Sequence, residues 1–333
     1  MLLQDPYNRR IDYLRISVTD RCNLSCFYCK PKTDRKMLLH DDILSYEEIL
    51  RLVTVAVPLG ISRVRVTGGE PLVRRGITDF VASLSNLSGI EDVSLTTNGV
   101  LLEEMAEALL AAGKPRLNIS LDSLNPERFH QITGMDCWKK VWRGICRVEE
   151  LEFFPIKINM VPVKDMNDDE VVDFARLTLD RRFHVRFIEF MPIGANDRWN
   201  RDVCISSDQI RAAIEQEFGP LAPFASGKSG GPAINYQIPG AQGVIGFISP
   251  ITRHFCESCR RLRLTADGKI RPCLLSETEI DIKSPLRGGC NDQELERLLK
   301  LALEIKPERH YIEEETGEMG TGCSRRAMFK IGG

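Results

Sequence analysis

The sequence predicts an α/β fold, an incomplete (βα)6 TIM-type barrel followed by a smaller C-terminal α+β region. Two observations lead to this class. Between residues 13 and 190, short β-branched runs alternate with longer amphipathic runs, which is typical of βα units around a parallel sheet. After residue 192 the alternation stops, and residues 219–232 are rich in Gly, Ser and Pro, which indicates a long loop. We therefore expect two domains, residues 1–192 and 193–333.

Six runs in the first region carry the pattern of strands. They are residues 13–18, 63–67, 93–97, 116–121, 156–161 and 185–190. The intervening runs read as helices, for example residues 45–57, where Ser45 and Glu48 have the spacing of a capping box. Six such units suggest a curved barrel whose chemistry gathers at the carboxyl ends of the strands.

Turn-forming residues mark those carboxyl ends. The segments concerned are residues 67–71, 96–99, 120–123 and 189–192. Each segment taken alone is also an ordinary turn, because Gly, Pro and Asn favour turns everywhere. In the second region we expect helices over residues 207–218 and 292–304, and strands over residues 234–238 and 244–248.

Composition excludes two classes of protein. A formal net charge of -2 on 333 residues is unlike the strongly basic balance of domains that hold nucleic acid by bulk charge. No run resembles a secretory signal, and none approaches the roughly 20 apolar residues of a membrane span. We expect a cytoplasmic protein that binds neither nucleic acid nor membrane. Its eleven cysteines, an odd number in a reducing compartment, favour metal ligation over disulfides.

The first cysteine triplet follows the first predicted strand. Cys22, Cys26 and Cys29 form a C-x3-C-x2-C loop, and three thiolates so close together can hold three corners of a four-iron cluster. The fourth iron then has no protein ligand and is open to react. A structural zinc site is the alternative, although such sites use four ligands.

This loop resembles the signature of the radical S-adenosylmethionine superfamily. Gly68-Gly69-Glu70-Pro71 is similar to the glycine-rich companion motif of the same superfamily. The resemblance implies that the open iron binds S-adenosylmethionine and that its cleavage yields a 5'-deoxyadenosyl radical. A Gly-Gly pair also permits close backbone approach to a ligand, which any Cβ would obstruct.

A second triplet, Cys256, Cys259 and Cys273, lies in the smaller region. It again offers three thiolates, and Cys290 and Cys323 are candidates for a fourth ligand that would close the site. We favour a second [4Fe-4S] cluster with an open iron that faces a ligand, because the triplet lies among arginines of the run 260–263.

Together, the two triplets, the arginine-rich run and the terminal Gly332-Gly333 resemble the GTP 3',8-cyclase family, molybdenum cofactor biosynthesis protein A, over nearly the whole chain. The resemblance implies a lyase with two [4Fe-4S] clusters and S-adenosylmethionine. Its radical removes the hydrogen from ribose C3' of GTP, and the carbon radical attacks guanine C8. Reduction of the resulting aminyl-type radical gives (8S)-3',8-cyclo-7,8-dihydroguanosine 5'-triphosphate. The alternative is another radical S-adenosylmethionine enzyme with an auxiliary cluster that acts on a peptide.

The resemblance also implies roles for individual residues. Those matching GTP contacts are Arg15, Arg65, Thr96, Lys157, Arg261, Leu262 and Arg263, and those around S-adenosylmethionine are Tyr28, Gly69, Ser120 and Met191. Arginine forks suit the oxygens of a triphosphate. The resemblance further implies an electron donor and a downstream cyclic pyranopterin monophosphate synthase as partners, a monomer or homodimer, and a Gly-Gly tail that reaches the active site.

Overall fold

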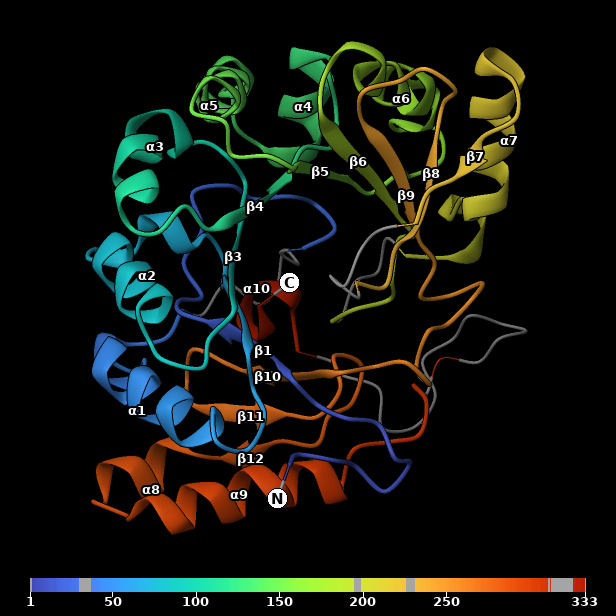
Figure 1. The fold of residues 1–333 in the computed structure, drawn as a ribbon. Coiled ribbons are helices and arrows are strands. Elements are labelled where there is room, and N and C mark those ends of the chain that lie inside the picture. The colour runs from blue at the N-terminus through green and yellow to red at the C-terminus, as the bar shows by residue number, and fades with distance from the viewer. Residues whose placement is uncertain are drawn as a thin grey trace.

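The computed structural model describes residues 2–29, 37–194, 199–225, 231–310, 312 and 326–332. Twelve strands of these residues form one sheet in the order β12-β11-β10-β1-β2-β3-β4-β5-β6-β9-β8-β7. The sheet curls around a central space, with most helices along its outer side and the C-terminal helix α10 inside (Figure 1). The predicted incomplete barrel is therefore confirmed.

Eight neighbouring strands of the sheet run parallel. In sheet order they are β10 (Arg261–Leu264), β1 (Tyr13–Ser17), β2 (Arg63–Thr67), β3 (Asp92–Thr97), β4 (Arg116–Ser120), β5 (Ile156–Met160), β6 (Phe183–Ile188) and β9 (Val244–Ile248). Antiparallel strands extend both edges: β11 (Lys269–Arg271) and β12 (Ile280–Asp281) lie beyond β10, and β8 (Ile234–Gln237) and β7 (Ala222–Pro223) lie beyond β9.

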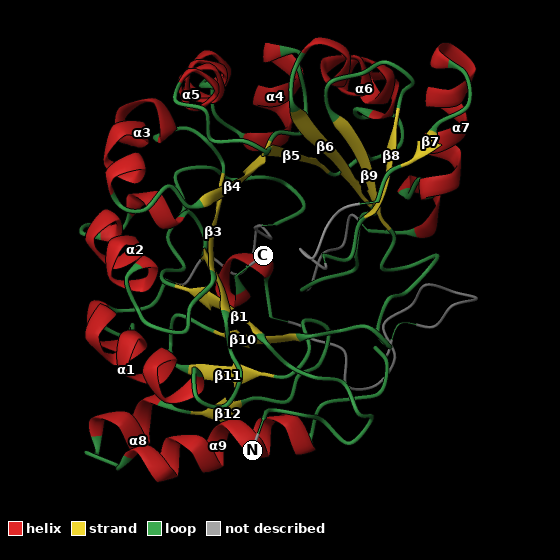
Figure 2. Ribbon diagram, in the orientation of Figure 1, coloured by secondary structure: helices red, strands yellow, loops and turns green. Residues whose placement is uncertain are grey.

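Helices alternate with the strands along the first part of the chain (Figure 2). The α-helices are α1 (Tyr46–Ala56), α2 (Ile77–Ser85), α3 (Leu102–Ala111), α4 (Pro126–Thr133), α5 (Trp138–Glu150), α6 (Val171–Asp180), α7 (Ser207–Phe218), α8 (Lys283–Arg287), α9 (Asp292–Glu304) and α10 (Met328–Ile331). The capping box predicted for α1 is present, since Ser45 accepts from the Glu48 backbone and Glu48 accepts in return. Among the described residues, no helix combines the length and hydrophobicity that a membrane span requires.

All six strands predicted for the first region form, with ends shifted by at most two residues. The C-terminal region shares the sheet of the first region. Its strands β9 and β10 pair in parallel with β6 and β1, so they extend the same sheet at both edges. The division into domains at residues 192 and 193 stays a prediction, because hydrogen bonds of one sheet cross it.

The hydrophobic core lies between the outer face of the sheet and the helices. Leu14 and Ile16 of β1 are fully buried in it, as are Ile49 and Leu52 of α1. Side chains alternate between the two faces of a strand, so the other residues of β1 point toward the central space.

Candidate functional site

The inner face of the barrel is polar. Parallel barrels usually fill this space with branched apolar side chains. Here the positions that alternate with the core residues include Tyr13, Arg15, Ser17, Arg63, Arg65, Thr67, Asp92, Ser94, Thr96, Arg116, Asn118, Ser120, Lys157, Asn159, His184, Arg186, Arg261 and Arg263, and Asp92 pairs with Arg116. We call this space the lumen.

Four of the predicted site arginines meet on the β10, β1 and β2 side of the lumen. Arg15 pairs in register with Arg263 on one side and Arg65 on the other. Burial lowers the pKa of Arg15 well below its usual value, and the charges of Arg263, Arg65 and Arg261 lower it further. Arg65 also lies 5.5 Å from the centre of the Tyr13 ring. A group of cations that repel one another in a buried space favours binding of an anion.

Lys157 of β5 lies among further cations. Burial, then Arg186, Arg116 and Arg65, lower its pKa to about 6. Burial and the charges of Arg65 and Arg116 lower the pKa of Arg186 to about 10. The sequence analysis missed Arg116 and Arg186. The signal that identifies them is the alternation of polar and apolar residues along β4 and β6, which places both arginines on the polar face.

Several buried polar atoms of the lumen have no hydrogen-bond partner. They are Nε of Arg15, Oγ1 of Thr96, Oδ1 of Asn118, Oδ1 of Asn159 and Nε of Arg186. Native proteins pair nearly all buried polar atoms, so unpaired ones gathered in one space need an explanation. An anionic ligand in the lumen would accept from the arginine Nε groups and balance the cations, and N–H or O–H groups of the same ligand would satisfy the two asparagine oxygens.

Leu262 differs from its neighbours on β10. Its side chain is fully buried in the hydrophobic core, and it pairs in register with Leu14. Arg261 and Arg263 point the other way, into the lumen. A ligand in the lumen can therefore reach only the backbone of Leu262, and the role predicted for this residue stays a prediction.

The first cysteine triplet lies on the loop that leaves the carboxyl end of β1. Cys22, Cys26 and Cys29 are all partly buried, and the backbone N–H of Cys29 donates to the carbonyl of Cys26 at 3.0 Å. Two N–H groups point at the Cys22 sulfur, from the Leu24 backbone at 3.4 Å and from Asn98 Nδ2 at 3.7 Å. Such donors stabilise a thiolate, so the chemistry of this set fits ligation of an iron–sulfur cluster.

Gly68 and Gly69 pack against the backbone that leads into this loop. A Cβ on Gly69 would lie 2.4 Å from the carbonyl oxygen of Arg21, and one on Gly68 would lie 2.5 Å from that of Thr19. Gly69 N donates to the Thr19 oxygen at 2.7 Å. The chain's own backbone therefore requires glycine at both positions, and the role of Gly69 beside S-adenosylmethionine stays a prediction.

Tyr28 joins the cysteine loop to the strand ends across the barrel. Its hydroxyl donates to the carboxylate of Asp122, which follows β4, at 2.5 Å. The centre of its ring lies 6.2 Å from that of Phe190, which follows β6. Burial raises the pKa of Asp122 to about 6, although the bond from Tyr28 opposes this. Ser120 ends β4 on the lumen side, and Met191 follows β6. The four residues predicted around S-adenosylmethionine, which include Gly69, therefore all follow strand ends on the side of the first triplet.

The second triplet holds three mutually interacting thiols. Cys259 and Cys273 each raise the pKa of Cys256, which burial raises most. Burial also opposes ionisation of Cys259, but Arg261 and Lys306 bring its pKa down to about 6. Lys306 fixes the two segments concerned, since its Nζ donates to the carbonyls of Arg261, at 3.0 Å, and Pro272. Thiolates held beside fixed cations fit the ligands of a cluster.

Strand register places the two triplets at opposite ends of the lumen. The first triplet follows Ser17, at the carboxyl end of β1. Cys259 precedes Arg261, which pairs with Tyr13 at the amino end of β1. About 13 Å of strand separates these two levels, at roughly 3.3 Å per residue. Arg15 and Arg263 lie between the triplets.

A fourth cysteine ligand, in a zinc site or a closed cluster, is the alternative for the second triplet. Cys290 precedes α9, whereas Lys306 follows it, so a helix about 20 Å long separates Cys290 from the triplet. Cys290 is therefore not a fourth ligand, and Cys323 lies outside the described residues. Within the described ranges, no three His, Cys, Asp or Glu side chains converge as ligands of a single metal ion do.

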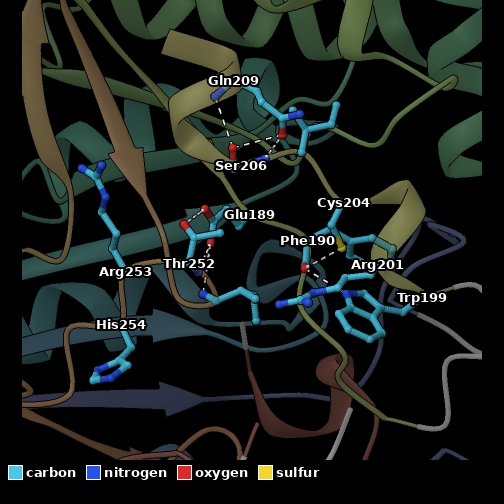
Figure 3. Close-up of a pocket in the computed structure, with 12 residues that line it drawn as sticks. Glu189, Phe190, Trp199, Arg201, Cys204, Ser206, Gln209, Thr252, Arg253 and His254 are labelled. Atoms are coloured by element: carbon cyan, nitrogen blue, oxygen red, sulfur yellow. Dashed lines mark hydrogen bonds between the residues drawn. The ribbon is translucent and has the colours of Figure 1, made fainter. Parts of the chain in front are cut away.

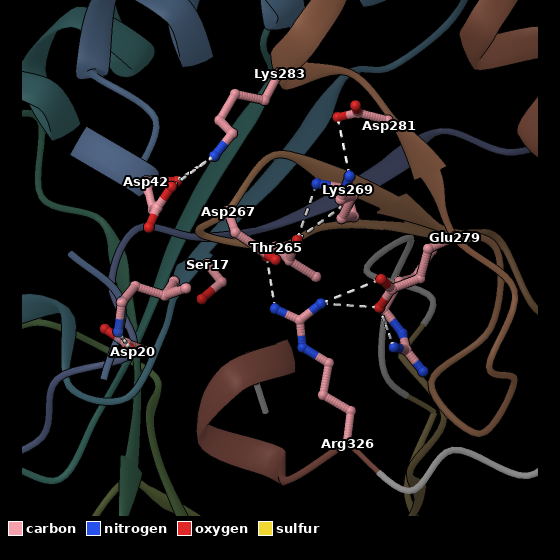
Figure 4. A network of polar contacts seen from close by, with 12 residues as sticks. Ser17, Asp20, Asp42, Thr265, Asp267, Lys269, Glu279, Asp281, Lys283 and Arg326 are labelled. Atoms are coloured by element: carbon pink, nitrogen blue, oxygen red, sulfur yellow. Dashed lines mark hydrogen bonds and ion pairs between the residues drawn. The ribbon is translucent and has the colours of Figure 1, made fainter. Parts of the chain in front are cut away.

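The described part of the C-terminal tail lies inside the barrel. Arg326 anchors it to the second region, through Asp267 at 2.6 Å and Glu279 at 3.0 Å (Figure 4). At the other end of α10, the carbonyl of Gly332 accepts from Arg263 Nη1 at 2.7 Å, and a Cβ on Gly332 would lie 2.8 Å from that of Ser17. Gly333 lies outside the described residues.

A separate cavity opens beside the barrel, between the segments that follow β6 and β9 and the start of α7 (Figure 3). Glu189 holds its wall together, accepting from the backbone N–H groups of Ser207, Ile251 and Thr252 at 3.0 to 3.2 Å. No residue of the predicted site lines this cavity. The lumen is the candidate site, because the cations and the unpaired polar atoms lie there.

Comparisons with known proteins agree with two parts of the chain. A profile of the Radical SAM superfamily matches residues 16–178, and a profile described as Molybdenum Cofactor Synthesis C matches residues 183–312. The chain is 48% identical over 329 residues to the GTP 3',8-cyclase of Desulforamulus reducens, covering 99% of both proteins. It is 50% identical over 326 residues to that of Gloeobacter violaceus, covering 97% of this chain and 99% of the relative.

Solved structures share the fold at low sequence identity. Streptococcus suis SuiB bound to S-adenosylmethionine has a TM-score of 0.59 and 16% identity, covering 91% of this chain and 77% of SuiB. The protein anSMEcpe with bound AdoMet has a TM-score of 0.54 and 16% identity, covering 88% of this chain and 81% of that protein. At this identity the likeness establishes the fold alone.

Proposed function

The chain belongs to the GTP 3',8-cyclase family of the Radical SAM superfamily, and on that premise we propose that it converts GTP to (8S)-3',8-cyclo-7,8-dihydroguanosine 5'-triphosphate for molybdenum cofactor biosynthesis. One observation of the structure carries the proposal. A lumen lined by convergent cations and unpaired polar atoms runs between two cysteine triplets. A bound triphosphate supplies the negative charge that this lumen lacks.

Cys22, Cys26 and Cys29 would hold the [4Fe-4S] cluster that the superfamily carries, beside S-adenosylmethionine. When bound, this pair supplies the 5'-deoxyadenosyl radical that takes the hydrogen from ribose C3' before guanine C8 is attacked. Tyr28, Gly69, Ser120 and Met191 would border S-adenosylmethionine, since Tyr28 lies in this loop and the other three lie at the carboxyl ends of β2, β4 and β6. The bond from Tyr28 to Asp122 holds the loop against the end of β4.

Arg15, Arg65, Lys157, Arg261 and Arg263 would bind the triphosphate. They approach it from four strands, and arginine forks can each satisfy two phosphate oxygens. Thr96 faces the same space with an unpaired hydroxyl. Arg186, which lies near Lys157, extends this cationic lining, whereas the charge of Arg116 is paired with the Asp92 carboxylate. Holding the nucleotide from several sides fixes the ribose relative to the radical source, which is where enzymes gain much of their rate.

Cys256, Cys259 and Cys273 would hold a second [4Fe-4S] cluster, at the other end of the lumen. Three thiolates leave one iron for the guanine base. Support comes from Arg261 and Lys306, which favour the Cys259 thiolate, and from the distance that separates Cys290 from the set. The alternative, a radical S-adenosylmethionine enzyme with an auxiliary cluster that acts on a peptide, is less well supported, because the lumen is cationic and the relatives are GTP 3',8-cyclases.

Three further parts of the proposal concern partners and organisation. An electron donor reduces the first cluster, and a cyclic pyranopterin monophosphate synthase takes the product. The chain acts as a monomer or homodimer. Residues 1–192 supply the radical machinery, and residues 193–333 supply the second triplet and the tail.

Anaerobic assay of the reconstituted enzyme tests this function. Each of the four nucleoside triphosphates is incubated with S-adenosylmethionine and a reductant. GTP alone is expected to give 5'-deoxyadenosine together with a cyclised product. Equal turnover of all four, or 5'-deoxyadenosine with GTP unchanged, would contradict the proposal.

A further inference from the structure

Asn98 connects three loops at the mouth of the barrel. It follows β3, and its Nδ2 donates to the Asn23 Oδ1 at 2.7 Å and to the Cys22 sulfur at 3.7 Å. Its backbone N–H donates to Glu70 Oε2 at 2.7 Å. Its Oδ1 accepts from the backbone of Val100 at 3.0 Å. Every hydrogen-bonding group of the side chain is thus directed.

Glu70 fixes the backbone position of Asn98. It is 1% exposed, and its second oxygen accepts from Thr97 Oγ1 at 2.8 Å and from Leu72 N at 3.0 Å. The carboxylate therefore ties the Gly-Gly loop after β2 to the end of β3. Because the backbone of residue 98 is held in this way, the amide is directed at Cys22 by the fold and not by chance side-chain rotation.

We propose that Asn98 raises the reduction potential of the cluster held by Cys22, Cys26 and Cys29, by donating its amide N–H to the Cys22 sulfur. This inference rests on the assignment of that triplet in the proposed function. Reduction adds one negative charge to the cluster and its thiolates, and an N–H dipole directed at a sulfur stabilises that charge. Asn98 is a positioning residue that contacts a ligand thiolate and need not contact substrate.

A second N–H that points at the Cys22 sulfur comes from the backbone of Leu24 and is part of the loop itself. Asn98 is the donor that a side-chain substitution can remove while the cysteines stay in place. Outer partners of metal ligands are known to set the properties of the metal in this way.

The test is a potentiometric titration of the reconstituted holoenzyme, followed by electron paramagnetic resonance. The signal of the first cluster is identified as the one that changes when S-adenosylmethionine is added. Asn98→Leu keeps the side-chain size and removes the donor. We expect the ratio of reduced to oxidised cluster at a fixed potential to fall about tenfold, which is about 59 mV for a one-electron couple.

Asn23→Ala is the matched control, because it removes the 2.7 Å bond to Asn98 and keeps the N–H directed at sulfur. It should shift the potential by less than a third as much. Asn98→Asp gives a second variant of nearly native shape, and it should lower the potential at least as far as Asn98→Leu.

The outcomes separate this inference from the proposed function. A wild-type signal that does not respond to S-adenosylmethionine overturns the assignment of the triplet. A responsive signal whose potential is unchanged in both Asn98 variants overturns the role of Asn98. A shift of the reduction potential in Asn23→Ala as large as in Asn98→Leu also overturns this role. The shift would then come from a change in the position of the cysteine loop.

Discussion

Arg263 of β10 donates a hydrogen bond from Nη1 to the carbonyl oxygen of Gly332 at 2.7 Å, inside the barrel. This bond joins a cation of the proposed triphosphate site to the second-last residue of the chain. Burial, then Arg261, lower the pKa of Arg263 to about 9, so the arginine already lies among like charges. The tail and the substrate site therefore share a residue.

Substitution of Gly332 should reduce cyclisation. Gly332→Ala places a Cβ 2.8 Å from that of Ser17 at a φ of 87°, which costs about 1–3 kcal/mol locally. We expect the yield of cyclised product to fall at least tenfold, by roughly the same energy. Gly240→Ala is the control, since Gly240 has a φ of 83° and open space around it. If both variants keep full activity, the tail has no role in the site.

GTP binding should weaken as pH rises. Burial and Arg186 hold the pKa of Lys157 near 6, well below the usual value of about 10.4. Between these values the free enzyme keeps Lys157 neutral, and a bound triphosphate restores its charge, so binding takes up a proton. Calorimetry from pH ~6 to ~8.5 should show this uptake and a falling affinity. Lys157→Arg stays charged across this range, so the only pH dependence of its GTP affinity should be that of the γ-phosphate itself. A pH dependence equal to that of the wild type would contradict the assignment.

Loss of a lumen cation should weaken GTP binding far more than loss of a surface one. Arg65→Ala removes a partly buried guanidinium from the proposed site, and bonds to charged groups contribute about 1.5–3 kcal/mol. We expect the dissociation constant for GTP to rise roughly 10- to 100-fold. Arg143→Ala is the control, since Arg143 pairs with Glu103 at the surface. Equal affinities for the two variants would place the triphosphate elsewhere.

Lys306 should be needed for the second cluster. It is 3% exposed, and Lys306→Met leaves the carbonyls of Arg261 and Pro272 without their donor, at a cost of about 1–3 kcal/mol. Iron analysis should fall from about eight to about four per chain. Lys300→Met, which breaks a surface pair with Glu296 on the same helix, should keep the full iron content. Full iron in Lys306→Met would show that the triplet needs no such anchor.

Periodicity was sufficient to predict the barrel. The β-branched runs located six strands, and the capping box of Ser45 and Glu48 located the start of α1. The two parallel strands that flank these six were harder to place. Strand β9 was predicted but not its parallel pairing with β6, and β10 was recognised only as an arginine-rich run, because partners distant in sequence are set by tertiary contacts.

Side-chain direction explains most of what the sequence left out of the site. Arg116 and Arg186 face the lumen through the same alternation that places Arg65 there, and the period of two along β4 and β6 carried this signal although it was not used. The close packing of the Gly-Gly loop against the backbone of Thr19 and Arg21 was also not predicted, because it joins segments about 50 residues apart. The bond between Asn98 and Cys22 joins residues 76 positions apart and has no signature in sequence.

The central claim is that two clusters at opposite ends of one lumen act on the same GTP. Its most direct test is the ratio of products from reduced, reconstituted Cys273→Ala. We predict that this variant still forms 5'-deoxyadenosine from S-adenosylmethionine and makes no cyclised nucleotide, because the first triplet is intact and the base is no longer held. Cyclised product at the wild-type rate would contradict the claim.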